Sequence, residues 1–190
     1  MADVSFENRV VIVTGAGNGL GKAYALELGK RGAKVVVNDL GGAVDGSGSG
    51  NSPADDVVNE IIENGGEAVA NYDSVATKDG GESIVQTAVD SFGTVDAVIN
   101  NAGILRDKSF ANMTEEEFSL IIEVHLKGTY FVTQPAFKIM KENNYGRIVN
   151  VASPSGIFGN FGQTNYGAAK MGIVGLTNVL AIEGAKYNIK

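Results

Sequence analysis

Short runs rich in valine and isoleucine alternate along the chain with stretches of helical pattern, and this alternation limits the possible folds more than any other feature. The apolar runs cover residues 9–14, 33–38, 68–71, 95–100 and 146–151. Runs that are apolar throughout are typical of strands in a parallel sheet whose two faces are both covered. Helix-like stretches follow them at residues 20–30, 53–64, 80–92, 114–143 and 166–186. This order predicts an α/β fold, a doubly wound parallel sheet with helices on both faces.

The composition fits a single globular domain over residues 1–190. With 44% hydrophobic and 19% charged residues among 190, the chain can bury a substantial core. No apolar run reaches the roughly 18 residues of a membrane span, and residues 1–8 lack the basic and apolar regions of a signal peptide. We therefore expect a protein of the cytoplasm or of an organelle matrix, with no membrane partner.

Residue counts exclude several kinds of chemistry. The chain has no cysteine, which excludes disulfides, thiol catalysis and cysteine-bound metals. Its one histidine, His125, cannot build a histidine metal site by itself, so we expect no metal. The 15 basic residues are outnumbered by 22 acidic ones and form no block, so nucleic acid is not an expected partner.

A glycine-rich turn directly follows the first predicted strand. Residues 14–21 read TGAGNGLG, and a helical pattern comes next. In this setting Gly15, Gly19 and Gly21 allow a tight turn, close approach of the backbone to a pyrophosphate, and close packing of helix on strand. Asn18 and Leu20 lie in the same turn, where the free N–H groups of a helix attract phosphates. The pattern predicts a Rossmann-type dinucleotide site that includes these five residues; a purely structural turn is the alternative.

Acidic residues after the next two predicted strands indicate which dinucleotide binds. Asp39 follows the second strand, 24 residues after Gly15, where a carboxylate accepts hydrogen bonds from the adenine ribose hydroxyls. It would repel the 2′-phosphate of NADP, and neither Asn18 nor Leu40 brings a compensating cation. The sequence therefore favours NAD, with Asp39 as a simple turn residue left as the alternative. Asp73 either lines the adenine pocket or serves in a cap or turn.

The segment 41–51, GGAVDGSGSGN, is longer than the usual connection in such folds. Five of its first ten residues are glycine. It is either a flexible surface loop or a segment whose start bends around a bound adenosine.

Ser153, Tyr166 and Lys170 form a set suited to moving a proton during hydride transfer. Tyr166 and Lys170 are four residues apart and therefore lie on one face of a helix. An ordinary tyrosine has a pKa of about 10, and an ammonium about 4 Å away favours its ionised form by roughly 4 kcal/mol at an effective dielectric near 20. Ser153, thirteen residues before Tyr166, would hold the substrate oxygen. Taken alone, the tyrosine and lysine spacing is a weak signal and is more typical of an ordinary amphipathic helix with a solvated lysine.

Together these motifs resemble the short-chain dehydrogenase/reductase family. TGAGNGLG at 14–21, NNAG at 100–103, Ser153 and YGAAK at 166–170 match the family's motifs in order and spacing across essentially the whole chain. Several stretches resemble more closely its (3R)-hydroxyacyl-CoA dehydrogenases, which form part of the peroxisomal multifunctional enzymes type 2 and have bacterial relatives. These stretches are VVVNDLGG from 35, NYDSV from 71, NNAGILRDKSF from 100, VHLKG from 124 and the run over 145–189.

The resemblance implies further site residues. In the family, residues matching 100–103 stabilise the sheet beside the cofactor, which adds Asn101, Ala102 and Gly103 to the cofactor site. Tyr166 and Lys170 are expected there as well, with Lys170 on the nicotinamide ribose. Where many members carry a catalytic asparagine, this chain has His125, which either replaces it in a relay or only packs in the helix.

Members of the family are longer than this chain and commonly dimerise through their two long helices. A sixth strand is expected to begin at residues 188–190, so the resemblance implies a fragment truncated before that strand, with much of the substrate pocket in the missing part. A homodimer is expected. The apolar residues expected to supply its surface are Phe131, Val132, Ile173, Leu176 and Leu180; the alternative is that all of these side chains face the sheet as core.

The implied activity is NAD-dependent oxidation of a secondary alcohol, the C3 hydroxyl of an acyl-CoA, to a ketone. Ser153 orients the alcohol, Tyr166 removes its proton and Lys170 assists it. The alternatives are a ketoacyl or ketosteroid reductase of the same family, and an NAD-binding fragment without turnover. For an enzyme of fatty-acid oxidation, the peroxisomal matrix is the alternative to the cytoplasm.

Overall fold

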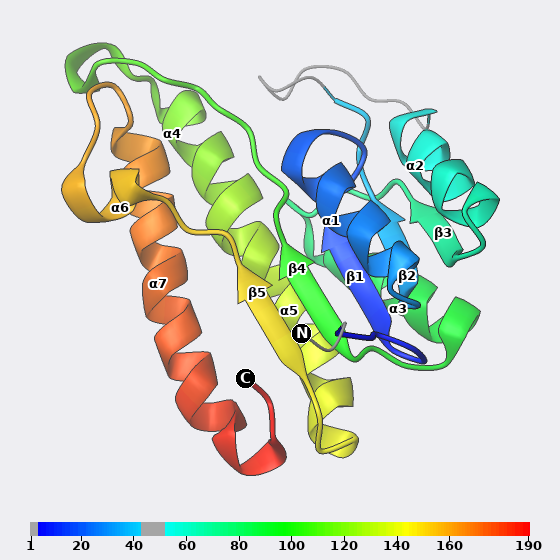
Figure 1. Cartoon of the computed structure of the whole chain (residues 1–190). Helices are drawn as coiled ribbons and strands as arrows, with labels where there is room; N and C mark the ends of the chain where they lie inside the picture. The colour runs from blue at the N-terminus through cyan, green and yellow to red at the C-terminus, as the bar shows by residue number, and fades with distance from the viewer. Residues whose placement is uncertain (1–3, 43–51) are drawn as a thin grey trace.

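The chain forms a five-stranded parallel sheet between two layers of helices in a computed structural model (Figure 1). The structure describes residues 4–42 and 52–190. In the sheet the strands run in the order β3-β2-β1-β4-β5. Their bounds are Val10–Thr14 for β1, Lys34–Asn38 for β2, Glu67–Asn71 for β3, Ala97–Asn100 for β4 and Arg147–Asn150 for β5. The predicted doubly wound parallel sheet is confirmed.

Helices follow each strand. Their bounds are Gly19–Lys30 for α1, Ser52–Glu63 for α2, Lys78–Phe92 for α3, Glu115–Ile121 for α4, Gly128–Glu142 for α5, Pro154–Phe158 for α6 and Thr164–Gly184 for α7. The helix predicted over 114–143 is continuous, but a π-helical segment, Ile122–Lys127, joins α4 to α5. Of the helices in the described part of the chain, none is both long and apolar enough to cross a membrane.

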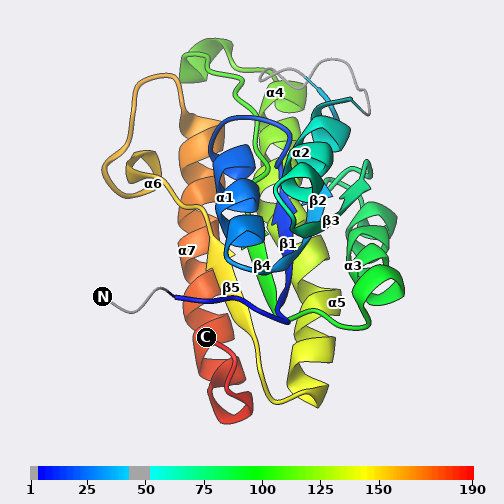
Figure 2. The ribbon, with the colours of Figure 1, turned by 45° about the vertical axis from the view of Figure 1, so that its right-hand side comes forward.

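The side chains of β1 show how the sheet separates two cores. Val10 and Ile12 point to the layer of α3 and α5, whereas Val11 and Val13 point to the layer of α1 and α2. Figure 2 shows these helix pairs on opposite faces of the sheet. All four side chains are at most 2% exposed, as expected for a central strand of a sheet covered on both faces.

Two of the five apolar residues expected on a dimer surface belong to the interior instead. Val132 is 0% exposed and packs with α3 and the sheet, and Ile173 is 2% exposed. The helical pattern of a sequence does not tell which apolar stripe faces the sheet when a helix is apolar on several sides. The exposed apolar side chains of α7 are Met171, Val179 and Ile182.

Four of the five strands end on an asparagine at the same edge of the sheet. Asn38 donates through Nδ2 to Asn71 Oδ1 at 2.9 Å, and Asn100 donates through Nδ2 to Asn150 Oδ1 at 2.8 Å. These amides hold neighbouring strand ends at a fixed spacing. The carboxyl edge of a doubly wound sheet is where such folds bind ligands, above the point where successive connections leave in opposite directions.

The last residues of the chain lie beside β5, where the sequence predicted the start of a sixth strand. A parallel bridge joins Gly146 to Ile189. The N–H of Ile148 donates to Lys190 O at 2.8 Å, and the N–H of Lys190 donates to Gly146 O at 3.0 Å. The edge of β5 is therefore paired along part of its length.

Candidate active site

The glycine-rich turn between β1 and α1 lies against the end of β4. Gly15 has a φ of +61°, and a Cβ built on it would lie 2.7 Å from the Cα of Ala102. A Cβ on Gly21 would lie 2.0 Å from the carbonyl oxygen of Gly15. Side chains at these two positions would therefore push the turn away from β4 or open it. The local fold requires glycine here for both conformation and space.

Asn101 fastens this turn to the sheet. Its Nδ2 donates to the carbonyl oxygens of Thr14 and Gly15, each at 3.0 Å. The main-chain N–H groups of Asn101 and Ala102 both donate to Thr14 Oγ1 at 3.1 Å. The residues after β4 and the turn after β1 thus form one rigid wall.

Asp39 is held by the main chain on both sides. Its Oδ2 accepts from the N–H of Gly17, and its Oδ1 accepts from the N–H of Gly41, both at 2.7 Å. A Cβ on Gly17 would lie 2.8 Å from Asp39 Cγ, so Gly17 has a role that the sequence analysis did not assign. The rest of the segment 41–51, from residue 43 onward, lies outside the described residues.

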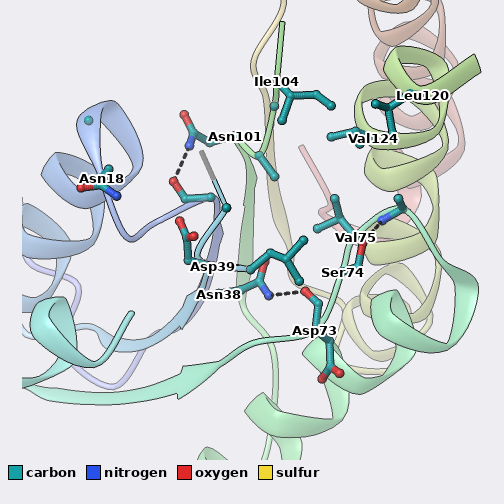
Figure 3. A pocket seen from close by; sticks show the side chains of 17 residues that line it. Asn18, Asn38, Asp39, Asp73, Ser74, Val75, Asn101, Ile104, Leu120 and Val124 are labelled. Atoms are coloured by element: carbon teal, nitrogen blue, oxygen red, sulfur yellow. Dashed lines mark hydrogen bonds between the residues drawn. The ribbon is translucent and has the colours of Figure 1, made fainter. Parts of the chain in front are cut away.

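A pocket of about 400 Å³ opens between these walls. Figure 3 shows Asn18 and Asp39 on one side and the apolar side chains of Ile104, Val124 and Leu120 on the other. Eight of the residues predicted for the cofactor line it: Gly15, Asn18, Gly19, Asp39, Asp73, Asn101, Ala102 and Gly103. The structure thus gathers residues from four strand ends into one cavity of the size that small-molecule sites have.

Asp73 lines the pocket, but its carboxylate turns away from it (Figure 3). Asp73 Oδ2 accepts from Ser83 Oγ at 2.7 Å and from Asn71 Nδ2 at 2.9 Å. Its carbonyl oxygen accepts from Asn38 Nδ2 at 2.9 Å. In this geometry the side chain belongs to a network that stiffens the ends of β2 and β3.

Several lining residues were absent from the sequence-based site: Asn38, Leu40, Gly42, Ser74, Val75, Ala76, Ile104, Leu120 and Val124. Most of them follow directly on strand ends, which is the signal that could have found them. Leu120 and Val124 come from the long helix, where their spacing of four residues marks one face. Among the predicted cofactor residues, Leu20, Gly21, Tyr166 and Lys170 are not part of the pocket lining. Leu20 is 64% exposed.

Tyr166 and Lys170 lie on successive turns at the start of α7. The Nζ of Lys170 is 5.5 Å from the centre of the Tyr166 ring and donates to the carbonyl oxygen of Val151, just after β5, at 2.6 Å. Lys170 is only 3% exposed, and burial lowers the pKa of its ammonium to about 8. Lys170 therefore places a poorly hydrated ammonium group near the Tyr166 ring, and its hydrogen bond connects α7 to the residue that follows β5.

Ser153 begins α6 and is brought against the same part of α7. Its Oγ accepts from the N–H of Ser155 at 3.2 Å, as a helix N-cap does. In α6, a Cβ on Gly156 would lie 2.8 Å from the main-chain nitrogen of Met171. The absence of a side chain thus allows α6 to touch α7 one turn after Tyr166. Within the described residues, no direct hydrogen bond joins Ser153 to Tyr166 or Lys170.

His125 lies in the π-helical segment and is 3% exposed. Its ring meets the Tyr166 ring edge to face, with centres 5.1 Å apart. Its Nε2 is 2.8 Å from the carbonyl oxygen of Ile104 and 3.1 Å from the Ile104 nitrogen. Burial, and then the charge of Lys170, lower its pKa to about 4, so the ring is neutral at physiological pH. His125 therefore packs against the tyrosine and also holds the segment after β4.

Comparison with known proteins agrees with this arrangement. A family model described as short chain dehydrogenase matches residues 9–190. The chain is 60% identical over 187 residues to the peroxisomal hydratase-dehydrogenase-epimerase of Saccharomyces cerevisiae, covering 98% of this chain and 21% of that protein. It is 59% identical over 184 residues to the peroxisomal multifunctional enzyme type 2 of Mus musculus, covering 97% of this chain and 25% of that protein.

A solved structure gives the same result for the fold. The crystal structure of a short chain dehydrogenase from Mycobacterium avium matches with a TM-score of 0.91 and 47% identity, over 98% of this chain and 66% of that one. The chain spans 21% and 25% of the two curated relatives above, so each of them has long regions without a counterpart here. Because the family model extends over residues 9–190, the chain belongs to the short-chain dehydrogenase family, whose members are oxidoreductases that use nicotinamide dinucleotides.

Proposed function

We propose that this chain binds NAD and carries the catalytic groups for oxidation of a (3R)-3-hydroxyacyl-CoA to the 3-ketoacyl-CoA. The observation that carries the proposal is the buried Lys170, held by Val151 O at 2.6 Å and one turn from Tyr166. Identities of 60% and 59% to multifunctional peroxisomal enzymes, together with the resemblance over residues 145–189, support the acyl-CoA class of substrate.

The pocket residues fit a dinucleotide. A side chain at Gly15 would collide with the end of β4, so the turn presents bare backbone and the free N-terminus of α1 to a pyrophosphate. The carboxylate of Asp39, fixed by the N–H groups of Gly17 and Gly41, is suited to ribose hydroxyls and would repel a 2′-phosphate. This supports NAD over NADP. When bound, the nicotinamide supplies the acceptor for hydride.

Each catalytic side chain has a task that its position supports. Ser153 Oγ binds the C3 hydroxyl oxygen and orients it. Tyr166 would take up the hydroxyl proton of the substrate at its phenolic oxygen, and a bound nicotinamide would supply the acceptor for the C3 hydride. Lys170, whose pKa is lowered to about 8 by burial, would stabilise negative charge on the Tyr166 oxygen, and the family resemblance implies that it would also hold the nicotinamide ribose.

The outer face of α7 supports a homodimer. Met171, Val179 and Ile182 are between 50% and 78% exposed on this helix. Apolar side chains along one helix can pair with their own copy across a two-fold axis. Light scattering should give the mass of two chains at micromolar concentration, and a monomer would contradict this proposal. The names of the relatives support the peroxisomal matrix as an alternative location to the cytoplasm.

Stereochemistry offers the sharpest test of the activity. If the nicotinamide binds in one orientation beside a fixed Tyr166 hydroxyl, only one hand of the alcohol would be positioned to react. The full-length protein with NAD should form NADH from (3R)-3-hydroxybutyryl-CoA, or a longer homologue, and largely ignore the 3S isomer. Equal rates on both isomers, or turnover of steroids but of no acyl-CoA, would favour the generic reductase. NADH binding without any turnover would identify a cofactor-binding chain.

A further inference from the structure

Asn165, the residue just before Tyr166, is a completely buried polar side chain. A buried amide costs free energy unless its donors and acceptor find partners. Its position on the interior side of the first turn of α7 therefore needs an explanation beyond helix formation. An asparagine has no helical advantage there, because its helix propensity is low.

The amide of Asn165 joins three segments. Its Nδ2 donates to the carbonyl oxygen of Arg106 at 3.0 Å and to that of Glu117 at 3.1 Å. Its Oδ1 accepts from the N–H of Tyr166 at 2.7 Å. That N–H is one of the first four of the helix, which have no partner within the helix. One side chain thus binds the segment after β4, the end of the first turn of α4, and the main chain of Tyr166.

Two further bonds join the same segments on the outside. The N–H of Lys108 donates to Gly162 O at 2.8 Å, and Gln163 Nε2 donates to Asp107 Oδ2 at 2.8 Å. The Gln163–Asp107 bond is exposed, and Lys108 is an exposed residue, so water competes for both bonds. Asn165 itself is 0% exposed and its three bonds are part-buried, so water competes less for them and they contribute more to holding the two segments together.

We infer that Asn165 is a positioning residue, which fixes the Tyr166 hydroxyl relative to the segment 104–108 that borders the cofactor pocket. Ile104 lines that pocket, so the clamp connects the cofactor side of the site to the proton-transfer side. This inference rests on the proposed dehydrogenase function. Catalysis depends on such distances, because displacement of a reacting group by about 1 Å can cost 10²-fold in rate.

Asn165→Asp isolates the two donated bonds. The aspartate keeps the size of the side chain and an acceptor for the Tyr166 N–H. As a carboxylate it donates to neither Arg106 nor Glu117, and when protonated by burial it donates to only one of them, so at least one donated bond is lost in either form. Thr177→Val is the matched control in the same helix. Thr177 Oγ1 accepts from Asn150 Nδ2 at 2.9 Å, so the control also removes a hydrogen bond between α7 and the sheet, three turns from Tyr166.

The test uses full-length protein and measures kcat and KM for (3R)-3-hydroxybutyryl-CoA, the Kd of NADH and the Tm. For Asn165→Asp we expect kcat to fall between about 10-fold and 10²-fold, with the Kd of NADH within twofold of wild type. For Thr177→Val we expect a lower Tm and kcat within twofold. Two results would overturn the inference. One is a decrease in the kcat of Asn165→Asp that is fully explained by a smaller fraction of folded protein; the other is an equal decrease in the kcat of Thr177→Val.

Amide hydrogen exchange provides a readout that does not depend on turnover. Peptides covering 104–108 and 162–168 should exchange faster together in Asn165→Asp and at the wild-type rate in Thr177→Val. Unchanged exchange at 104–108 would overturn the clamp even if activity were lost. If the wild-type protein oxidised no alcohol at all, the proposed function would fail, and the exchange result alone would then decide whether Asn165 couples the two segments.

Discussion

His125 should make folding stability depend on pH in a way that can be isolated, because it is the only histidine in the chain. Burial, followed by the charge of Lys170, lowers its pKa in the fold from 6.5 to about 4. In the unfolded chain the imidazole titrates near its ordinary pKa of about 6.5. Between these values the unfolded state binds more protons than the folded state, so stability is lost as the pH falls.

The size of this loss of folding stability follows from the pKa shift of His125. A change in pKa from 6.5 to about 4 corresponds to a loss of about 3 kcal/mol once the pH has fallen to 4. At pH 5 the loss is about 2 kcal/mol, and above pH 6.5 it vanishes. His125 is only 3% exposed, so solvent screening does not reduce this figure. For a domain of ordinary stability this is a substantial fraction of the total.

His125→Gln is the variant that separates this effect from other titrations. Glutamine does not titrate. Its amide nitrogen is as many bonds from Cβ as the imidazole Nε2, so it can still reach the main chain of Ile104. Urea unfolding is followed by circular dichroism, since the chain has no tryptophan. Between pH 7 and pH 5 the wild type should lose about 2 kcal/mol more stability than the variant, because carboxylates titrate in both and cancel. Equal losses would mean that the folded protein protonates His125 freely, which would refute the reasoning.

Three further predictions concern the site. Asp39→Ala should reduce the difference in affinity between NADH and NADPH, because the anion that repels a 2′-phosphate is removed. Both affinities can be measured by nicotinamide fluorescence, and tighter binding of NADPH than of NADH by the wild type would contradict the role of Asp39. Tyr166→Phe should leave NADH binding intact and lower turnover by about 10² or more, the usual scale for a lost general base; unchanged turnover would exclude Tyr166 as proton carrier. Gly156→Ala should lower kcat for the alcohol by about tenfold and leave NADH binding unchanged. The new Cβ would lie 2.8 Å from Met171 N, so α6 would move away from α7 and Ser153 would move with it. Gly175→Ala, whose Cβ meets nothing within 4 Å, is the control in α7, and equal losses in both variants would count against the packing argument.

The sheet could be predicted from sequence because its signal is local. Each strand is a short apolar run, and the observed β1, Val10–Thr14, lies within the predicted 9–14. The glycine turn was equally clear, since Gly15 requires both a positive φ and an absent Cβ. By contrast, α6 was not predicted, because Pro154–Phe158 is too short for a periodic pattern. Its start did carry a signal, a serine N-cap followed by proline at the first helical position.

Orientation of side chains could not be predicted in the same way. Asp73 was left between two roles, and only the structure shows its carboxylate bound to Ser83 and Asn71 while the residue still lines the pocket. The π-helical segment around His125 was also not predicted, because residues 114–143 were interpreted as one regular helix and such segments are rare single turns inside α-helices. The partners of the Asp73 carboxylate lie only two and ten residues away in the sequence, so what the sequence did not show was the direction of the side chain.

The residues that hold this site together share one property: each binds main chain that is distant in the sequence. The sequence identified Asn101 and His125 but not these contacts, and it did not indicate Asn165. Asn101 binds the carbonyl oxygens of Thr14 and Gly15, His125 binds the main chain of Ile104, and Asn165 binds that of Arg106 and Glu117. In each case the bonded partner is a main-chain group. Because every residue type has such a group, the residue type at the partner position does not reveal the contact. The proposed proton transfer would need Tyr166 at a fixed distance from the cofactor pocket, and side chains that bind remote backbone can fix that distance. The chemical groups of the site can therefore be recognised from motifs, whereas the distances between them are determined by these asparagine and histidine clamps.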